Sequence, residues 1–271
     1  MNLSSISLKD LNILYNKQMD LYKSEGENIE FLCFLKSLSQ DKRAGAKVLM
    51  NRFNNFEKRN EEETSRVREM YDLDRSFNVI HLAGADEVGR GPLAGPIVAA
   101  AVILESNLSS KNDLILGLKD SKKLNSRSRE ELAEIIKKKA ISYHIASINN
   151  TEIDKYGIQR CNVEVLRRSI LGLKPVPDYA ISDGYAVKDL NMPTSNIIKG
   201  DVYSAAIAAA SIIAKVYRDN LMLEYSKIYP QYNFECNMGY GTKEHIAALT
   251  LYGPTSLHRK SFIKNFIYDK K

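Results

Sequence analysis

Two adjacent carboxylates, Asp86 and Glu87, directly precede a glycine-rich loop, and they are the residues whose types and spacing best suit chemistry. Apolar stretches at residues 79–83 and 97–104 flank this region, and each predicts a strand. Glycine has no Cβ, so the loop at residues 89–91 can turn sharply and approach another molecule closely. Two acids beside this Gly-Arg-Gly loop indicate a site that holds cations on one side and a phosphate backbone on the other.

A more ordinary interpretation of the Asp-Glu pair is a solvated turn, because acidic residues are mostly exposed. Neighbouring residues on a strand point to opposite faces, so both can face one cation only where the strand ends or bends. The glycine pattern is not that of a nucleotide-binding loop. A Walker loop ends in Gly-Lys-Ser/Thr and a Rossmann loop opens a helix, whereas this loop ends in Gly95-Pro96 and a β-branched, alanine-rich run follows.

Two further acids follow apolar stretches farther along the chain. Asp183 ends a predicted strand that starts at Asp178, and a glycine follows it. Asp201 comes after a short predicted strand and a turn, directly before a long helix expected from Val202 to about Ile228. Helix capping is an alternative role for Asp201, because an acid is favourable at a helix N-terminus. Asp178 competes with Asp183 for the same role, and we prefer Asp183 because the glycine follows it.

Four carboxylates cannot share one site without cations, because mutual repulsion would raise their pKa values or unfold the site. Mg²⁺ and similar hard cations accept carboxylate oxygens and keep positions for water and phosphate. Two such ions about 4 Å apart can activate a water and stabilise the leaving oxygen of a phosphodiester. The Gly-Arg-Gly loop and a lysine-bearing loop at residues 118–125 would contact phosphates, and backbone groups near a sugar can distinguish a 2′-OH.

The whole chain is moderately basic, with a formal net charge of +6 over 271 residues, which favours a polyanionic partner. Its three cysteines lie far apart without Cys-x-x-Cys spacing, which argues against disulfides or a zinc site and for a reducing compartment. The N-terminus lacks the features of a secretory signal. No apolar run approaches the roughly 20 residues that cross a bilayer. We expect a cytoplasmic protein that is monomeric and contacts no membrane.

Residues 1–76 differ in composition from the rest, because Gly and Pro are nearly absent and charges are dense. We expect a helical N-terminal extension over 1–76 and an α/β domain over 77–271. Acidic and basic residues are mixed over 57–68, which favours a solvated helix there over an arm that grips substrate.

The α/β domain is expected to contain further helices and strands between and after its acids. These are a helix capped by Ser128 with Glu131 and ending near Lys139, a strand at 141–148, a helix at about 151–173, and a helix capped by Thr242. Lys215 and Arg218 lie on the long helix after Asp201, and we expect both side chains to be exposed.

Several of these motifs together resemble the ribonuclease HII family. They occur in the family's order over residues 79–262: Gly84-Ala-Asp-Glu-Val-Gly-Arg-Gly-Pro-Leu-Ala-Gly-Pro96, Asp120-Ser-Lys-Lys-Leu124, Ser182-Asp-Gly184, Lys199-Gly-Asp201 followed by Ile207 to Lys215, Gly239-Tyr-Gly-Thr-Lys-Glu-His245, and His258-Arg-Lys-Ser-Phe262. The related ribonuclease HIII lacks the Gly-Arg-Gly-Pro form of the first motif, so Arg90 favours HII.

The resemblance implies an α/β fold of the ribonuclease H type, a mixed five-stranded sheet flanked by helices. It implies a metal-dependent endonuclease that cleaves RNA in RNA–DNA hybrids and cuts 5′ of single ribonucleotides embedded in duplex DNA. The products would carry 3′-OH and 5′-phosphate ends. Such an enzyme would act in DNA replication or DNA repair. An extension like residues 1–76 occurs in some bacterial members, which indicates a bacterial enzyme.

The resemblance also carries over site residues one by one. The catalytic acids, expected to ligate Mn²⁺ or Mg²⁺ directly or through water, would be Asp86, Glu87, Asp183 and Asp201. The residues expected to contact substrate would be Gly89, Arg90 and Gly91 at the 2′-OH, Tyr240 near the following sugar, and Lys122 and Lys123 at phosphates.

Two other classes of function remain as alternatives. A hybrid-binding module without catalysis would be free to lose a carboxylate, and none of the four is missing. A nucleotide-dependent phosphotransferase is disfavoured by the absent Walker lysine. The endonuclease is the preferred hypothesis.

Overall fold

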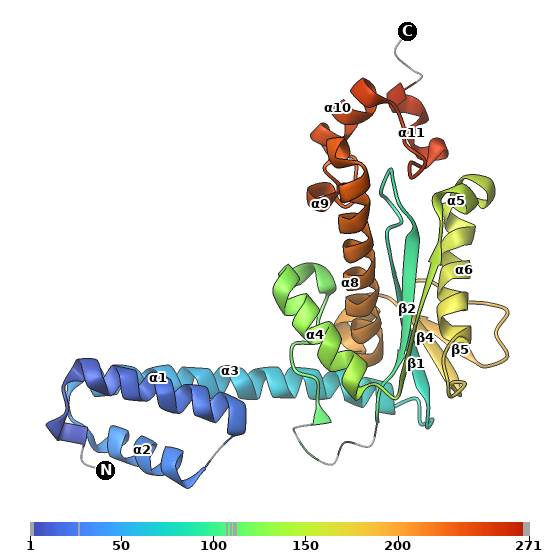
Figure 1. The fold of residues 1–271 in the computed structure, drawn as a ribbon. Helices are drawn as coiled ribbons and strands as arrows, with labels where there is room; N and C mark the ends of the chain where they lie inside the picture. Colours follow the sequence, from blue (N-terminus) through green and yellow to red (C-terminus); the bar gives the residue numbers. More distant parts are fainter. Residues whose placement is uncertain (1–2, 27, 107, 109, 111–112, 268–271) are drawn as a thin grey trace. The chain divides into compact units, whose positions relative to one another are not determined.

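The structure, a computed structural model, describes residues 3–26, 28–106, 108, 110 and 113–267 (Figure 1). The chain divides into two compact units, Met1–Ser65 and Arg66–Lys271. The division into domains at residue 76 stays a prediction. No helix among the described residues is long and apolar enough to span a bilayer.

The first unit is made of helices. It contains η1 (Leu3–Ser5), α1 (Leu8–Glu25), α2 (Ile29–Gln40) and the first part of α3 (Ala44–Arg75). Ser7 and Asn28 cap α1 and α2 by accepting hydrogen bonds from backbone N–H groups of the first turn. Aromatic and aliphatic side chains from the three helices form a separate core, in which the rings of Tyr22 and Phe31 stack with centroids 4.4 Å apart.

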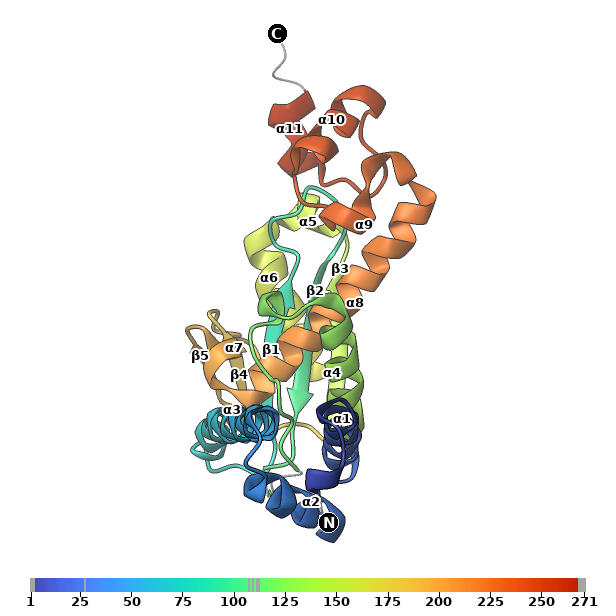
Figure 2. The same ribbon diagram turned by 90° about the vertical axis from the view of Figure 1, so that its left-hand side faces the viewer.

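The second unit contains the mixed five-stranded sheet that the family resemblance predicted. Its strands are β1 (Leu82–Val88), β2 (Ile97–Ile103), β3 (Ser142–Ile148), β4 (Tyr179–Asp183) and β5 (Thr194–Ile197). They lie in the order β3-β2-β1-β4-β5 (Figures 1 and 2). The pairs β1–β2 and β2–β3 are antiparallel, and β1–β4 and β4–β5 are parallel.

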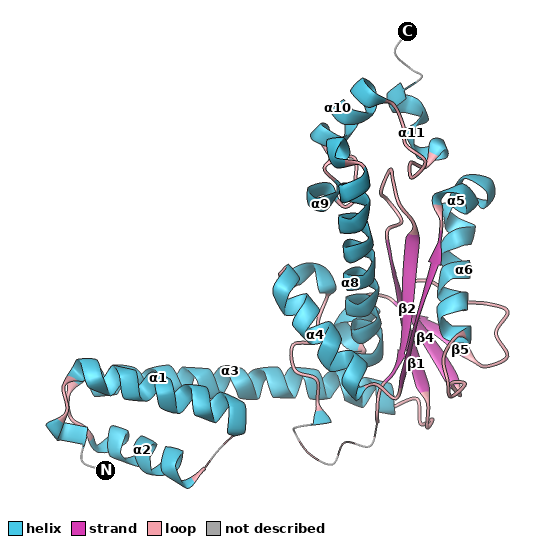
Figure 3. Cartoon of the chain, in the orientation of Figure 1, coloured by secondary structure: helices cyan, strands magenta, loops and turns pink. Residues whose placement is uncertain are grey.

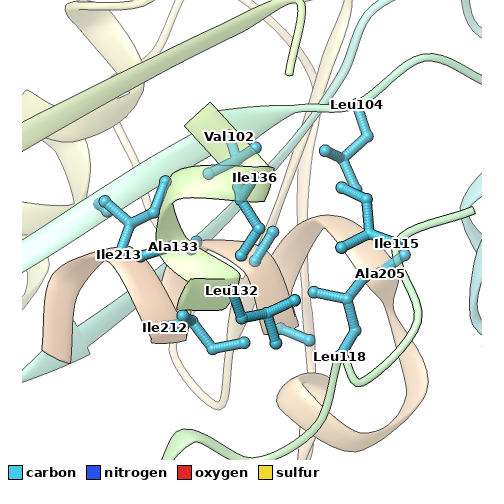
Figure 4. Packing of buried hydrophobic residues seen from close by; sticks show 14 of the residues in the cluster. Val102, Leu104, Ile115, Leu118, Leu132, Ala133, Ile136, Ala205, Ile212 and Ile213 are labelled. Atoms are coloured by element: carbon cyan, nitrogen blue, oxygen red, sulfur yellow. The ribbon is translucent and has the colours of Figure 1, made fainter. Parts of the chain in front are cut away.

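Helices cover both faces of this sheet, as Figure 3 shows. On one face lie α4 (Ser126–Lys139) and α8 (Ala205–Ile228), and on the other lie α5 (Asn150–Tyr156) and α6 (Ile158–Leu171). Alternate residues of β2 separate the two cores: Val98, Ala100 and Val102 pack with α4 and α8, whereas Ala99 and Ala101 pack with α6. Figure 4 shows the first core, where Leu118, Leu132 and Ile136 meet side chains of α8.

The remaining elements follow or connect these layers. They are η3 (Ser121–Lys123), α7 (Gly200–Tyr203), η4 (Pro230–Tyr232), α9 (Phe234–Asn237), α10 (Lys243–Tyr252) and α11 (Lys260–Ile267). Thr242 caps α10 as predicted, since its hydroxyl accepts a hydrogen bond from the His245 N–H.

The structure corrects the first predicted strand. It begins at Leu82 rather than at residue 79, and it continues through both acids to Val88. The reason is pairing with β2, because Asp86 lies opposite Ala100 and Glu87 opposite Ala99. Pairing with β2 therefore extends this strand beyond the end of its apolar sequence stretch.

Three predicted helix boundaries are also wrong. The helix expected at 151–173 is interrupted at Gly157, whose φ of +81° ends α5 before α6 begins. The long helix expected from Val202 is broken at Ser204, which caps α8 by accepting a hydrogen bond from the Ile207 N–H. The cap of α4 is Asn125 rather than Ser128, because the Asn125 side chain accepts a hydrogen bond from the Ser128 N–H.

Candidate active site

The two acids of β1 point to opposite faces of the sheet. Directly opposite residues of an antiparallel pair share a face, and Ala100, opposite Asp86, packs in the α8 core, whereas Ala99, opposite Glu87, packs in the α6 core. Both acids nevertheless line one cavity of about 530 Å³. They can do so because β1 ends at Val88, one residue later, where the chain turns into the Gly-Arg-Gly loop.

This cavity brings together nine of the ten predicted site residues. They are Asp86, Glu87, Gly89, Arg90, Gly91, Lys122, Asp183, Asp201 and Tyr240. Lys123 is exposed and does not line the cavity. The competing acid, Asp178, lies directly before β4, where its carboxylate accepts a hydrogen bond from the His81 N–H at 2.8 Å. The geometry therefore separates Asp178 from the other acids and leaves Asp183 among them.

The cavity wall also includes Ser121, Tyr185, Ser211 and Lys215, which were not predicted as site residues. The expectation that Lys215 is exposed is wrong, because its side chain is only 14% exposed and donates a hydrogen bond to Asp219 at 2.7 Å. The hydroxyl of Ser121 lies 3.0 Å from that of Ser211, which in turn hydrogen-bonds the Asp86 carboxyl. The spacing of Ser211 and Lys215, four residues apart on the predicted helix after Asp201, could have indicated that both face the acids.

Like charges and burial perturb the acids of the cavity. Burial raises the pKa of Asp86 well above its ordinary range, and the carboxylates of Glu87 and Asp183 raise it further. Burial raises the pKa of Glu87 to about 7, although the Arg90 guanidinium opposes this shift. Burial and the Asp183 carboxylate also raise the pKa of Asp201, which Lys122 lowers in part. Without a cation, burial and like charges therefore oppose the ionisation of Asp86, Glu87 and Asp201.

The donor set of the cavity fits a hard divalent cation. Its acids supply only oxygen ligands, and the Oε2 atom of Glu87 is buried without a hydrogen-bond partner among the described residues. Some acid oxygens are occupied by the protein itself, since Asp183 Oδ1 accepts a hydrogen bond from the Gly200 N–H at 2.7 Å. Within the described ranges, no three acidic, histidine or cysteine side chains already stand in an arrangement that would hold a metal.

The Gly-Arg-Gly loop forms the other wall. Gly89 has a φ of +92°, and a Cβ there would lie 2.3 Å from Nε of Arg218, so only glycine fits. The Arg90 guanidinium lies 4.6 Å from the ring centroid of Tyr185 and hydrogen-bonds its hydroxyl. A Cβ on Gly91 would lie 3.8 Å from the Tyr240 ring, so loop and tyrosine face each other.

A family model described as ribonuclease HII matches residues 83–265. The chain belongs to the ribonuclease HII family. A ribonuclease HII of Clostridium tetani is 56% identical over 243 residues, which cover 89% of this chain and 90% of that protein. One from Clostridium perfringens strain 13 is 50% identical over 267 residues, which cover 98% of this chain and 96% of that protein. The second match therefore includes most of the N-terminal unit.

The solved structures agree with this membership. The chain resembles the structure of a PCNA:RNase HII complex from Archaeoglobus fulgidus with a TM-score of 0.55 and 25% identity, over 70% of this chain and 98% of that one. The prediction of the family, of its ribonuclease H-like fold and of an endonuclease is confirmed. As a member of the ribonuclease HII family, the chain is a nuclease of the ribonuclease H class.

Proposed function

We propose that the chain cleaves RNA in RNA–DNA hybrids and cuts 5′ of single ribonucleotides embedded in duplex DNA. The reaction depends on Mn²⁺ or Mg²⁺ and leaves 3′-OH and 5′-phosphate ends. The observation that carries this proposal is one cavity that joins four acids from β1, β4 and α7 to the Gly-Arg-Gly loop and Tyr240. Family membership supports activity on RNA–DNA hybrids.

Asp86, Glu87, Asp183 and Asp201 are the residues that would hold the cations. Bound divalent ions supply a nucleophilic water at neutral pH and charge stabilisation at the scissile phosphate. Bound cations would favour the ionised form of these acids, whose carboxylates would orient the cations, and the buried, unpartnered Oε2 of Glu87 is free to act as a ligand. Lys122 and Lys215 line the same cavity and offer positive charge to the phosphate backbone.

The residues that recognise the sugar lie on the opposite wall of the cavity, which the Gly-Arg-Gly loop and Tyr240 form. We assign the 2′-OH to the backbone of residues 89–91, because a backbone without side chains can approach a ribose closely. The ring of Tyr240 is 40% exposed and faces Gly91, which supports our assignment of this side chain to the sugar that follows the ribonucleotide. Lys123 would contact phosphate farther from the cut, since it lies outside the cavity lining.

The proposal includes the expected setting of the enzyme. We propose a cytoplasmic monomer that removes ribonucleotides from DNA in replication or repair, with residues 1–76 as an extension of the catalytic domain. A catalytically silent hybrid-binding module is disfavoured, because all four acids are present and line one cavity.

The test uses a DNA duplex with one ribonucleotide, incubated with Mn²⁺, with Mg²⁺ and with a chelator. We expect a single metal-dependent cut 5′ of the ribonucleotide. Asp86→Asn should abolish cleavage and leave binding largely intact, whereas Asp178→Asn, a change of an acid outside the cavity, should leave cleavage near the wild-type rate. Full activity of the Asp86 variant would overturn the assignment, and cleavage of long RNA tracts alone would move the specificity to another ribonuclease H type.

A further inference from the structure

Arg259 is a fully buried cation that holds the Gly-Arg-Gly loop. Its exposed fraction is 0%, and its guanidinium donates hydrogen bonds to Gly95 O at 3.0 Å, Arg90 O at 2.8 Å and Gly89 O at 2.6 Å. The loop and Arg259 are about 170 residues apart in the chain. Within the described residues, Arg259 has no carboxylate at ion-pair distance. Its guanidinium is instead compensated by these carbonyls, by the Phe262 ring with a centroid 5.1 Å away, and by the more distant Asp154 carboxylate.

Burying a cation without a carboxylate is costly unless every donor is satisfied in good geometry. The cost is visible in the pKa of Arg259, which burial lowers to about 9. Two of the three charge-assisted bonds go to Gly89 and Arg90 and the third goes to Gly95, so together they hold residues 89–95 in one conformation. The bonds to Arg259 therefore fix the direction in which the carbonyls of Gly89 and Arg90 point.

The direction of these carbonyls decides where the next amides point. In a trans peptide unit, C=O and N–H point in opposite directions. Because the carbonyls of Gly89 and Arg90 point at Arg259, the N–H groups of Arg90 and Gly91 point away from it. Neither N–H has a hydrogen-bond partner within the part of the chain that the structure describes, and both residues line the cavity of the acids.

We propose that Arg259 is a positioning residue for sugar recognition. By holding the carbonyls of Gly89 and Arg90, it turns the N–H groups of Arg90 and Gly91 toward the cavity as two donors for the hydroxyl of a ribose. This inference rests on the proposed function and adds the residue that determines how strongly ribose is preferred over deoxyribose.

Arg218 offers a matched control. It is also 0% exposed, and its guanidinium donates to the carbonyls of Pro96 at 3.0 Å, Met238 at 2.9 Å and Ala94 at 3.3 Å. It therefore holds the far end of the same loop without bonding the Gly89 or Arg90 carbonyl. Lysine keeps the charge of arginine but cannot reproduce its planar fork, so Arg→Lys removes the same geometry at both positions.

The experiment measures two quantities for wild type, Arg259→Lys and Arg218→Lys. One is kcat/KM on a duplex with a single ribonucleotide, and the other is the inhibition constant of the matched all-DNA duplex. For Arg259→Lys we expect kcat/KM to fall about tenfold or more, as for the loss of an oriented hydrogen bond, with the inhibition constant within about twofold. Arg218 packs against Gly89 but bonds neither of the two carbonyls, so for Arg218→Lys we expect a smaller loss of kcat/KM than for Arg259→Lys, with the inhibition constant within about twofold.

The outcomes separate this inference from the proposed function. A wild type that leaves the ribonucleotide duplex uncut overturns both. If the wild type cuts, an unchanged kcat/KM in Arg259→Lys, a parallel loss of all-DNA binding, or an equal loss in Arg218→Lys overturns the inference alone.

A second measurement needs no variant and decides the matter if Arg259→Lys does not fold. Backbone amide NMR of ¹⁵N-labelled wild type in chelator compares the ribonucleotide duplex with the all-DNA duplex. Shifts of the Arg90 and Gly91 amides that occur only with the ribonucleotide duplex support the inference. Identical shifts with both duplexes overturn it.

Discussion

Asp74 is a buried carboxyl that should make the stability of the second unit depend on pH. It lies in the last turn of α3, and its Oδ2 accepts a hydrogen bond from the Ala206 N–H at 2.8 Å, in the first turn of α8. Its Oδ1 is buried without a partner among the described residues. Burial raises the pKa of Asp74 to about 7, although hydrogen bonds from Ser204 and Ala206 oppose the shift.

The sign of the effect follows from the raised pKa. The folded protein holds the Asp74 proton more tightly than the unfolded chain, whose pKa is about 3.8, so this group destabilises the fold as pH rises from about 4 to 7. A difference of about 3 pKa units corresponds to about 4 kcal/mol of unfolding free energy, which is lost in full above pH 7. Below pH 4 the group contributes nothing.

Asp74→Asn removes the titration and keeps an oxygen that can accept from the Ala206 N–H. The difference in unfolding free energy, variant minus wild type, should therefore rise by about 2.5 kcal/mol between pH 5 and pH 7. At about 2–4 °C per kcal/mol for a unit of this size, the melting temperatures should diverge by roughly 5–10 °C over that range. The side-chain NH₂ group of the new asparagine does not titrate. It therefore changes the unfolding free energy by the same amount at every pH and does not affect how the difference varies with pH.

The assay is urea unfolding followed by circular dichroism at pH 5, 6, 7 and 8 in the absence of divalent cations. The control is Asp72→Asn, which removes a neighbouring carboxylate whose side chain is 51% exposed. Burial also raises the pKa values of Asp86 and Glu87 in the cavity, but these acids are common to both proteins and cancel in the difference. Stability curves of Asp74→Asn and wild type that run parallel from pH 5 to 8 would refute the reasoning.

Other consequences can be tested separately. A protein that starts at Arg66 should stay folded, whereas one that starts at Phe77 should lose several kcal/mol, because Val67, Met70 and Tyr71 belong to the core of the second unit; equal denaturation midpoints would contradict this. Leu118→Ala should cost about 3 kcal/mol in urea unfolding, since Leu118 is 0% exposed, and a loss under 1 kcal/mol would argue against tight packing there. His258, whose pKa is lowered to about 4 mainly by burial, should stay neutral at pH 6 in an NMR titration; it stabilises the fold above pH 6.5, and this stabilisation is lost as pH falls through 4. A midpoint near 6.5 would show that the ring is solvated.

Local sequence predicted much of what lies within a few residues along the chain. The alternation of side chains on a strand separates Asp86 from Glu87, and the turn signals place Asp183 at a strand end. Thr242 caps its helix because the capping bond joins residues only three apart. Such features depend on backbone geometry that a short segment determines by itself. The family motifs then predicted which acids would meet, and the structure places those acids in one cavity.

The tertiary structure decided what depends on partners far away in the chain. Arg218 was expected to be exposed, but it is fully buried, because residues 94 and 96 offer carbonyls to a side chain 122 to 124 residues later. A helical pattern shows which residues share a face, yet it does not show what covers that face. The same holds for Arg259, whose contacts with Gly89 and Arg90 arise only when the C-terminal segment packs on the loop. Sequence thus determined the chemistry of the acids and of the glycine loop, and long-range packing determined the direction in which that loop presents its backbone.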